Sequence, residues 1–163
     1  MKSITFLSIL IILLEYTYSL SSKIDLNTTP ILKGMNIVGK TGLCVSARNP
    51  FGRLVQQPCG ETKDLLWKEI LWGKNVILVS SNGQVMDNAG SKKHNGNPVY
   101  AWSRHNGFNQ QWIIIRIRKN GKYLIKNIGT GKCLDDTGKA GVGRFYHIWD
   151  CNENNVNQWF DLR

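Results

Sequence analysis

The stretch Phe108–Ile115 reads FNQQWIII, so an asparagine and two glutamines directly precede a tryptophan and a run of isoleucine. A run this apolar and β-branched is typical of a buried strand. The strand alone does not explain why polar residues adjoin it. Tryptophans in comparable surroundings lie about 45 residues away on either side, at Trp67 and Trp159. This spacing indicates that the stretch closes one unit of an internal repeat.

The repeat extends over three aligned segments, which run from Gly42 to Trp67, from Gly83 to Trp112 and from Gly131 to Phe160. Each segment opens with a glycine, any residue, and a cysteine or valine, followed by an apolar residue and a serine or aspartate. A β-type stretch lies in the middle of each segment and reads RLVQQPC, NPVYAWSR or RFYHIWDC. Three copies of about 45 residues therefore fill the chain beyond its N-terminal leader.

The cysteines follow the same frame. Cys44 and Cys133 stand just after the opening glycines, and Cys59 and Cys151 follow the middle stretches of the first and third segments. The second segment has lost both cysteines together, as a bond within each repeat would require. We therefore predict the disulfides Cys44–Cys59 and Cys133–Cys151. Because no Cys-x-x-Cys pair occurs, zinc binding and thioredoxin-type chemistry are poorly supported.

The secondary structure is predicted to be all-β. Short runs rich in β-branched residues, separated by turn signals, occur at 75–81, 110–118 and 122–127. Asn120-Gly121, between the last two runs, is the strongest hairpin signal in the chain. No segment shows sustained helical periodicity. Regularly spaced short strands in three copies indicate a closed, barrel-like fold with pseudo-threefold symmetry.

With three copies that each end at or near Gln-x-Trp, the chain resembles the ricin B-type lectins. The resemblance rests on Gly-x-Cys-Leu-Asp, a mid-repeat tryptophan followed by cysteine, and Asn-Gln-x-Trp, and it covers residues 36–163. It implies a β-trefoil domain over those residues, preceded by a lead-in at 22–35. It also implies a sugar pocket in which an aspartate accepts hydrogen bonds from two sugar hydroxyls. In such a pocket an aromatic ring stacks on the apolar face of the sugar.

The second repeat matches the family pattern throughout. The resemblance assigns its carbohydrate-binding residues as Asp87, Trp102, Tyr100, Asn109 and Gln110. Asp87 is the acid and Trp102 is the stacking ring. Asn109 is expected to reach the sugar, and Gln110 is expected at the edge of the core, where it can brace Asp87 or bind the backbone.

The third repeat matches only in part. It supplies candidates for a weaker second site, which are Asp135, Trp149, His147 and Asn157. When Trp159 is aligned on Trp112, a valine and Asn157 replace the Asn-Gln pair. The polar support of Asp135 is then incomplete. The neighbouring Asp136 is expected to face solvent.

The first repeat lacks the chemistry of the pocket. Ser46, Gln57 and Leu65 replace the acid, the aromatic residue and the signature glutamine. Its closing tryptophan, Trp67, is nevertheless present. The closing tryptophans of all three repeats are therefore predicted to be core residues. Gln111, the variable residue of Gln-x-Trp, is expected to point outward.

Residues 1–21 have the features of a signal peptide. Lys2 gives a positive start, an uninterrupted apolar run covers 4–14, and small residues follow. The apolar run is shorter than the roughly 20 residues that span a bilayer. The even number of cysteines also favours an oxidising, extracellular compartment, where disulfides persist. We therefore predict a secreted protein.

The chain carries a formal net charge of +10, which favours anionic partners. Five basic residues crowd around the predicted 116–126 hairpin: Arg116, Arg118, Lys119, Lys122 and Lys126. One alternative function is therefore charge-driven binding to acidic glycans, wall polymers or a membrane surface. Another is a β-trefoil that binds or inhibits proteins without binding sugar. Secretion argues against a nucleic-acid partner.

Nothing in the chain predicts an enzyme. The histidines His94, His105 and His147 fall in no metal-binding or nucleophile motif. We predict a lectin that requires no cofactor or metal and binds glycans or glycoproteins chiefly through the second repeat. A preference for galactose or N-acetylgalactosamine is implied by the family resemblance alone.

Overall fold

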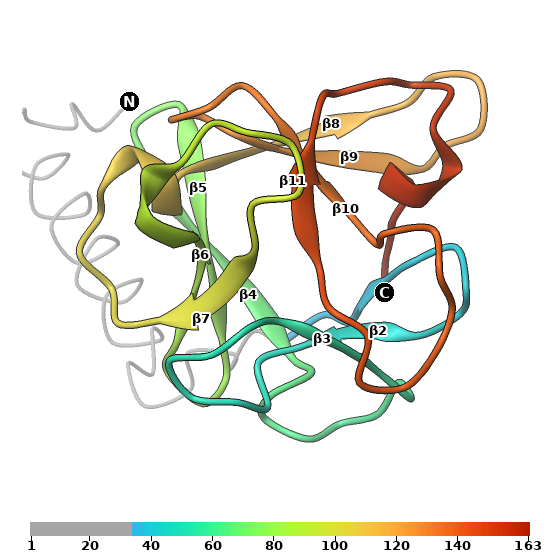
Figure 1. The fold of residues 1–163 in the computed structure, drawn as a ribbon. Helices are drawn as coiled ribbons and strands as arrows, with labels where there is room; N and C mark the ends of the chain where they lie inside the picture. The colour runs from blue at the N-terminus through green and yellow to red at the C-terminus, as the bar shows by residue number, and fades with distance from the viewer. Residues whose placement is uncertain (1–33) are drawn as a thin grey trace, which may run out of the picture. The chain divides into compact units, whose positions relative to one another are not determined.

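Short antiparallel strands make up most of the regular structure in the computed structural model, which describes residues 34–163 (Figure 1). The strands are β1 (Ile37–Val38), β2 (Cys44–Ser46), β3 (Val55–Gln57), β4 (Trp67–Trp72), β5 (Asn75–Ser80), β6 (Val85–Asn88), β7 (Val99–Trp102), β8 (Trp112–Arg116), β9 (Tyr123–Asn127), β10 (Cys133–Asp135), β11 (His147–Trp149) and β12 (Asp161–Leu162). Single 3₁₀ turns occur at η1 (Ala89–Ser91), η2 (Phe108–Gln110) and η3 (Val156–Gln158).

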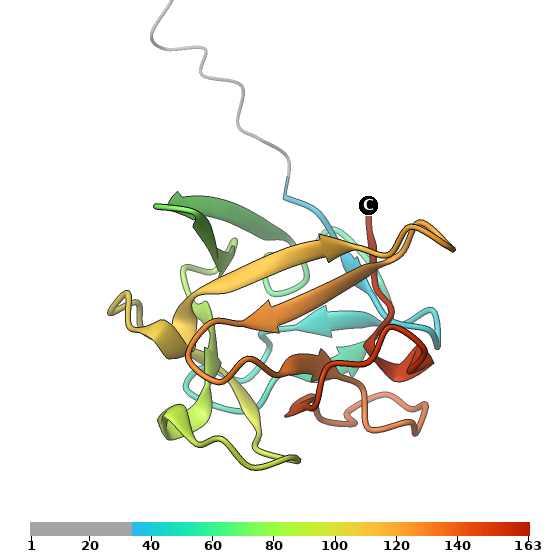
Figure 2. The same ribbon diagram turned by 90° about the horizontal axis from the view of Figure 1, so that it is seen from above.

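A closed ring of strands forms a barrel. Between repeats, β4 pairs with β5, β8 with β9, and β12 with β1. Within repeats, the ring is completed by three further antiparallel pairs, which are Met35–Trp67, Val76–Trp112 and Tyr123–Phe160. Figure 2 shows the β8–β9 hairpin lying along one side of this ring. The equivalent junctions recur once per repeat, so the barrel has the predicted pseudo-threefold symmetry.

Each repeat adds one two-stranded hairpin to the barrel. These hairpins are β2–β3, β6–β7 and β10–β11. Their registers match, because Ser46 lies opposite Val55, Asp87 opposite Tyr100, and Asp135 opposite His147. A barrel with three such hairpins is a β-trefoil, so the all-β prediction and the predicted architecture are confirmed.

The core contains the same positions from each repeat. Examples of these threefold sets are Ile37, Leu78 and Ile125; Val45, Met86 and Leu134; and Leu54, Val99 and Tyr146, all fully buried. Two closing tryptophans complete the core and satisfy their indole N–H groups. Trp67 Nε1 donates to the Val45 carbonyl at 2.8 Å, and Trp112 Nε1 donates to the Met86 carbonyl at 3.0 Å.

The prediction that Trp159 closes the third repeat is wrong. Phe160 is fully buried in that place and pairs with Tyr123. Trp159 is only partly buried; its Nε1 donates to the Glu153 carbonyl and its ring lies beneath the Lys119 ammonium. The loop after β11 is one residue longer than the loop after β7, and this insertion moves the closing residue by one position.

Both predicted disulfides are confirmed. Cys44 is bonded to Cys59 and Cys133 to Cys151, each pair with a Cα–Cα distance of 5.0 Å. Each bond joins the first strand of a hairpin to the residues that follow its second strand. The bonds therefore restrain equivalent loops in the first and third repeats.

The predicted hairpin around Asn120-Gly121 is also confirmed, because it joins β8 and β9. The expectation that Gln111 points outward is wrong. Its side chain is buried, accepting a hydrogen bond from Asn75 Nδ2 and donating one to the Asn106 carbonyl, each at 2.9 Å. The turn between β4 and β5 brings Asn75 to Gln111, which a reading of one repeat by itself does not reveal.

The predicted signal peptide at 1–21 and residues 22–33 of the predicted lead-in lie outside the described residues. Within residues 34–163, no helix is long and apolar enough to cross a membrane.

Candidate functional site

The β6–β7 hairpin and η2 together form an open pocket in the second repeat, with a volume of about 460 Å³. Its lining residues are Asp87, Ala89, Gly90, Ser91, Tyr100, Trp102, His105 and Asn109. Asp87 lies directly opposite Tyr100 in the hairpin, so these two side chains share one face of it. Four of the five residues predicted for this site therefore line one cavity, and the fifth, Gln110, is buried behind it.

Hydrogen bonds from two amide side chains hold the Asp87 carboxylate in place. Asn109 Nδ2 lies 3.0 Å from each carboxylate oxygen, and Gln110 Nε2 donates to Oδ2 at 2.8 Å. Asp87 itself is 4% exposed. A buried carboxylate held in this way keeps a fixed direction, and its remaining acceptor capacity faces the pocket.

Gln110 also organises the loop beside the pocket. Its Nε2 donates to the Ser103 carbonyl at 2.8 Å, and its Oε1 accepts hydrogen bonds from the backbone N–H groups of His105 and Asn106. Gln110 is fully buried. It therefore braces both Asp87 and the 103–106 backbone from behind, as the sequence led us to expect, and does not line the cavity.

Two aromatic rings supply the apolar wall. The ring centroids of Tyr100 and Trp102 are 6.4 Å apart, and 39% of Trp102 is exposed, whereas Trp112 is fully buried. An exposed indole in the same pocket as a fixed carboxylate can stack on the C–H face of a sugar while the acid accepts its hydroxyls. The tryptophans thus have separate roles, with Trp112 in the core and Trp102 at the pocket.

Burial raises the pKa of Asp87 above its ordinary value, and the hydrogen bonds from Gln110 and Asn109 only partly offset this effect. His105 lies against the same carboxylate, with its Nε2 3.3 Å from Oδ2. The sequence did not single out His105 as a pocket residue, because it lies in the loop between the aromatic strand and η2.

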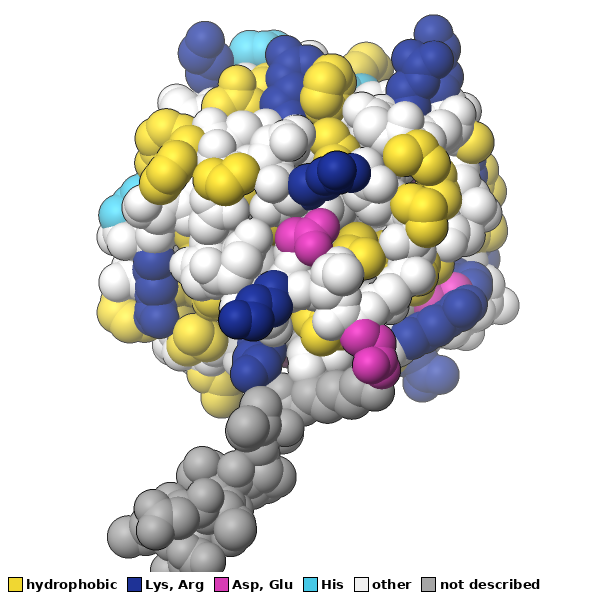
Figure 3. All heavy atoms as spheres, turned by 90° about the horizontal axis from the view of Figure 1, so that it is seen from below, with side chains coloured by type: hydrophobic (Ala, Val, Ile, Leu, Met, Phe, Trp, Pro, Cys, Tyr) yellow, Lys and Arg dark blue, Asp and Glu magenta, His cyan; other side chains and the backbone are white. Residues whose placement is uncertain are grey.

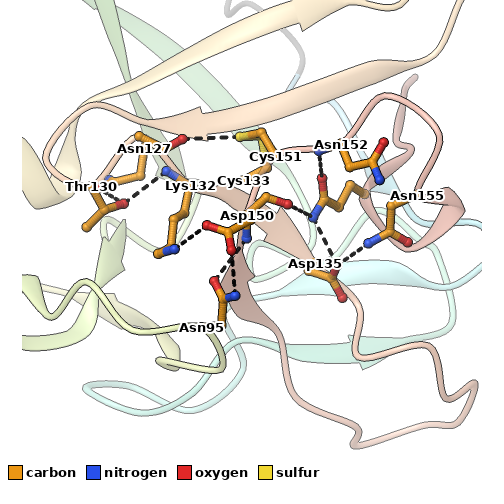
Figure 4. The surroundings of a disulfide bond; sticks show 12 residues. Asn95, Asn127, Thr130, Lys132, Cys133, Asp135, Asp150, Cys151, Asn152 and Asn155 are labelled. Carbon is orange, nitrogen blue, oxygen red and sulfur yellow. Dashed lines mark hydrogen bonds and ion pairs between the residues drawn. A yellow bond between two sulfur atoms is a disulfide. The ribbon is translucent and has the colours of Figure 1, made fainter.

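The third repeat forms a smaller pocket of about 220 Å³ at the equivalent place, lined by Asp135, Thr137, His147, Trp149, Asn155 and Asn157. All four predicted residues therefore come together. His147 Nε2 lies 3.2 Å from Asp135 Oδ1. Asn155 Nδ2 donates to Asp135 Oδ2 at 2.9 Å, as Figure 4 shows. Gln158 Nε2 donates to Oδ2 at 3.2 Å and to the Asp150 carbonyl at 2.9 Å.

The sequence alignment of this repeat was wrong by one residue. Gln158 makes the contacts that Gln110 makes in the second repeat, so the signature glutamine is present and Asp135 has full polar support. The pair Asn157-Gln158 repeats Asn109-Gln110, and alignment on that pair would have found it. Asn155, which the sequence analysis missed, donates to the Asp135 carboxylate, as Asn109 does to Asp87 in the second repeat.

The carboxyl groups of Asp135 and Asp136 have pKa values that are shifted in opposite directions. Burial raises the pKa of Asp135, but hydrogen bonds from His147, the Thr137 amide and Gln158 outweigh it and hold the pKa below its ordinary value. Asp136 does not face solvent as expected, since it is 1% exposed. Gln56 Nε2 donates to the Asp136 carbonyl, and burial raises the pKa of the Asp136 carboxyl group.

The pKa of Asp87 is raised and the pKa of Asp135 is lowered. We therefore predict that acid weakens ligand binding in the second-repeat pocket and in the third-repeat pocket at different pH values. Protonation removes the charge of the carboxylate and turns one of its oxygens into a hydrogen-bond donor. A ligand that binds the charged form therefore loses affinity about tenfold per pH unit below the pKa. Because the pKa of Asp87 is raised and that of Asp135 is lowered, the Asp87 pocket should lose its ligand at a higher pH than the Asp135 pocket does. Ligand binding measured from pH 6 to pH 3 on Trp149→Ala and Trp102→Ala, which isolate the two pockets, checks this order.

Circular dichroism at each pH serves as the control for folding. If the Asp135 pocket lost its ligand at the higher pH, the proposed difference between the carboxyl groups would be wrong.

The first repeat exchanges the acid and its partner. Ser46 stands where the other repeats have aspartate, and its Oγ donates to Asp64 Oδ2 at 2.6 Å. Asp64 occupies the position of Asn109, which the sequence analysis missed. A cavity of about 420 Å³ lies here, but Gln57 replaces the aromatic ring. This repeat thus has a carboxylate without a stacking surface.

Within residues 34–163, no group of three or more His, Cys, Asp or Glu side chains is arranged to hold a metal ion.

Comparison with known protein families supports the resemblance noted in the sequence. Residues 108–162 match the model of the family described as ricin-type beta-trefoil lectin domain-like. No curated protein matches the chain. The family match covers the third repeat and the closing residues of the second.

Solved structures extend the likeness to the described fold. A designed threefold-symmetric protein, ThreeFoil, has a TM-score of 0.72 at 20% identity, over 78% of this chain and 96% of its own. The ricin B-like lectin of Macrolepiota procera, solved with lactose, has a TM-score of 0.69 at 21% identity, over 82% and 98%. The Polyporus squamosus lectin, bound to Neu5Acα2-6Galβ1-4GlcNAc, has a TM-score of 0.67 at 20% identity, over 78% and 47%.

Proposed function

From the premise of a ricin-type β-trefoil, we propose that this protein is a secreted, non-enzymatic lectin that binds galactose-type glycans, chiefly through the second repeat. One observation carries the proposal. Equivalent hairpins of two repeats each hold a buried carboxylate, braced by amides, beside a half-exposed tryptophan. Neutral sugars need this pairing of fixed acceptor and apolar surface, since they present hydroxyls on one side and C–H groups on the other.

Galactose as the ligand class draws support from the relatives. The Macrolepiota procera lectin was solved with lactose, and the glycan on the Polyporus squamosus lectin contains galactose. Two disulfides favour an oxidising compartment and hence secretion. A second pocket on the same domain would let the protein bind two branches of one glycan surface, which raises avidity without new contacts.

We expect the third-repeat pocket to bind sugar more weakly than the second-repeat pocket. It is about half as large, at about 220 Å³ against about 460 Å³. Lys40 Nζ also donates to Asn157 Oδ1, so this amide is already engaged. We expect a weaker contribution to affinity from the third repeat.

Charge-driven binding through the 116–126 hairpin has less support. Lys122 is paired with Asp161 at 2.7 Å, and Lys119 donates to Asn154. The face that lies away from this hairpin, seen from below in Figure 3, carries lysine and arginine side chains that stand apart among neutral and apolar ones. On the hairpin itself, the pairing of Lys122 with Asp161 lowers the positive charge that an anionic polymer would meet.

Salt dependence separates these functions. Binding of a neutral galactoside should change less than about twofold between low and ~0.2 M salt, because no net charge is exchanged, whereas binding of an acidic polymer should collapse over the same range. A glycan array with neutral and acidic glycans, run at both salt concentrations, makes the comparison. Retention of acidic glycans alone, lost at the higher salt concentration, would favour the charge-driven alternative.

A further inference from the structure

The three repeats share a tight turn that leads into the second strand of each hairpin. The turns cover 49–52, 94–97 and 141–144, and each is closed by a hydrogen bond from its fourth residue to its first, namely Gly52 N to Asn49 O, Asn97 N to His94 O, and Arg144 N to Gly141 O. The third residue of each turn has a positive φ. It is Phe51 at 57°, Gly96 at 84° and Gly143 at 83°.

Phe51 is the exception in this set. A positive φ places Cβ against the backbone, so turns of this kind favour glycine at that position and a bulky aromatic residue there is strained. The other two repeats use glycine. Phe51 is 56% exposed, so burial in the core does not account for the residue. Strained residues of this kind cluster at ligand-binding sites.

The position of Phe51 links it to the pocket of the second repeat. Residues 51–54 run antiparallel to β7, with Ala101 N donating to Gly52 O and Leu54 N to Val99 O, each at 2.8 Å. Arg53 lies opposite Tyr100, which in turn lies opposite Asp87 across β7 and β6. Side chains opposite one another point to the same face of a sheet. The pocket face therefore continues past β7 onto this segment.

The ring of Phe51 stands against the stacking ring of the pocket. Its centroid lies 5.3 Å from that of Trp102, at an interplanar angle of 85°. Phe51 lies on the side of β7 away from Asp87, so it extends the apolar wall outward from the carboxylate. In the third repeat the same place beside Trp149 holds Gly96, which has no side chain.

We propose that Phe51 forms a second sugar subsite next to the Asp87 pocket, so that the second repeat recognises glycans of at least two units. The first ring occupies the pocket between Asp87 and Trp102. The adjoining ring lays its C–H face on the exposed part of Phe51. This inference rests on the proposed lectin function. It gives the second repeat a selectivity that the third repeat lacks.

Phe51→Gly tests the subsite without threatening the fold, because glycine is the residue that the equivalent turns use. Isothermal titration should be run with methyl β-galactoside and with lactose. The wild-type protein should bind lactose about five- to tenfold more tightly than the monosaccharide. Phe51→Gly should remove this preference, leave the monosaccharide affinity unchanged and keep a melting temperature no lower than that of the wild type. Phe108→Ala, which removes another exposed phenylalanine that lines neither pocket, should leave both affinities unchanged.

The possible failures are distinguishable. Equal losses for both sugars in Phe51→Gly would show that Phe51 only positions Trp102, and an unchanged lactose preference would show that the residue contacts no sugar. Either result overturns the subsite while the lectin function stands. A wild-type protein that binds neither sugar would overturn the galactose proposal and the subsite together.

Discussion

Replacing the carboxylate of Asp87 by an amide, in Asp87→Asn, should weaken galactoside binding at the second repeat about 100-fold. Hydrogen bonds to a charged acceptor are worth about 1.5–3 kcal/mol each. The proposed ligand makes two of them with this group, and the amide keeps one acceptor oxygen, so the change removes about one of the two. The change also places the new NH₂ group near Asn109 Nδ2 and Gln110 Nε2, which already donate to this carboxylate. Because all three of these amide groups are donors, they cannot all be satisfied, and the side chain at position 87 is then no longer held in a fixed orientation.

The measurement is titration with a neutral galactoside in a Trp149→Ala background, where the third-repeat pocket is silenced. Asp135→Asn in the same background is the matched control, because it makes the same chemical change in the equivalent place of the other pocket. This control should leave the remaining affinity unchanged. A folded Asp87→Asn protein that binds the sugar as the wild type does would remove the second repeat from the proposed function.

The largest effect on stability is expected from Phe160→Ala. Phe160 is fully buried in the core cluster, and its ring centroid lies 6.3 Å from that of Tyr146. Loss of a buried aromatic side chain leaves a cavity and lowers the free energy of unfolding by about 3–5 kcal/mol. By contrast, Trp159→Ala removes a partly exposed ring that makes one hydrogen bond and one ammonium contact and packs against the edge of the cluster of Ile117, Leu124 and Cys133. Because only part of the ring is buried, its expected cost is about 1–2 kcal/mol.

Urea denaturation of the two variants measures this difference. The repeat pattern by itself predicts the reverse order, since it aligns Trp159 with the buried Trp67 and Trp112. A larger loss for Trp159→Ala than for Phe160→Ala would therefore restore that alignment and contradict the buried position of Phe160.

Much of the fold could be predicted because repetition makes local patterns informative. A turn signal or a strand pattern is weak once and strong when it returns in the same place three times. The disulfides followed from the same reasoning, since Val85 and Arg104 replace both cysteines of one repeat at once. The hairpin registers that place Asp87 and Asp135 in their pockets also follow from the local alternation of side chains.

The remaining features depend on contacts between segments, which local patterns do not contain. One extra residue after β11 separates two possible alignments of the third repeat, one on Trp159 and one on the Asn157-Gln158 pair. The hydrogen bonds of Gln158 decide for the second alignment. Gln111 is buried because the end of the β4–β5 hairpin reaches it. Asp64 pairs with Ser46 from the far end of its repeat.

For FNQQWIII, the sequence alone determined that the stretch closes a repeat and that Trp112 belongs to the core, because spacing and alternation are properties of the chain. The tertiary structure decided what each amide does. Gln110 braces Asp87 and a loop, Asn109 holds both carboxylate oxygens, and Gln111 ties two hairpins together. It also brought Phe51 from the first repeat to the pocket of the second. Hydrogen bonds and ring contacts act over a few ångströms in space, and folding alone determines which distant residues come that close.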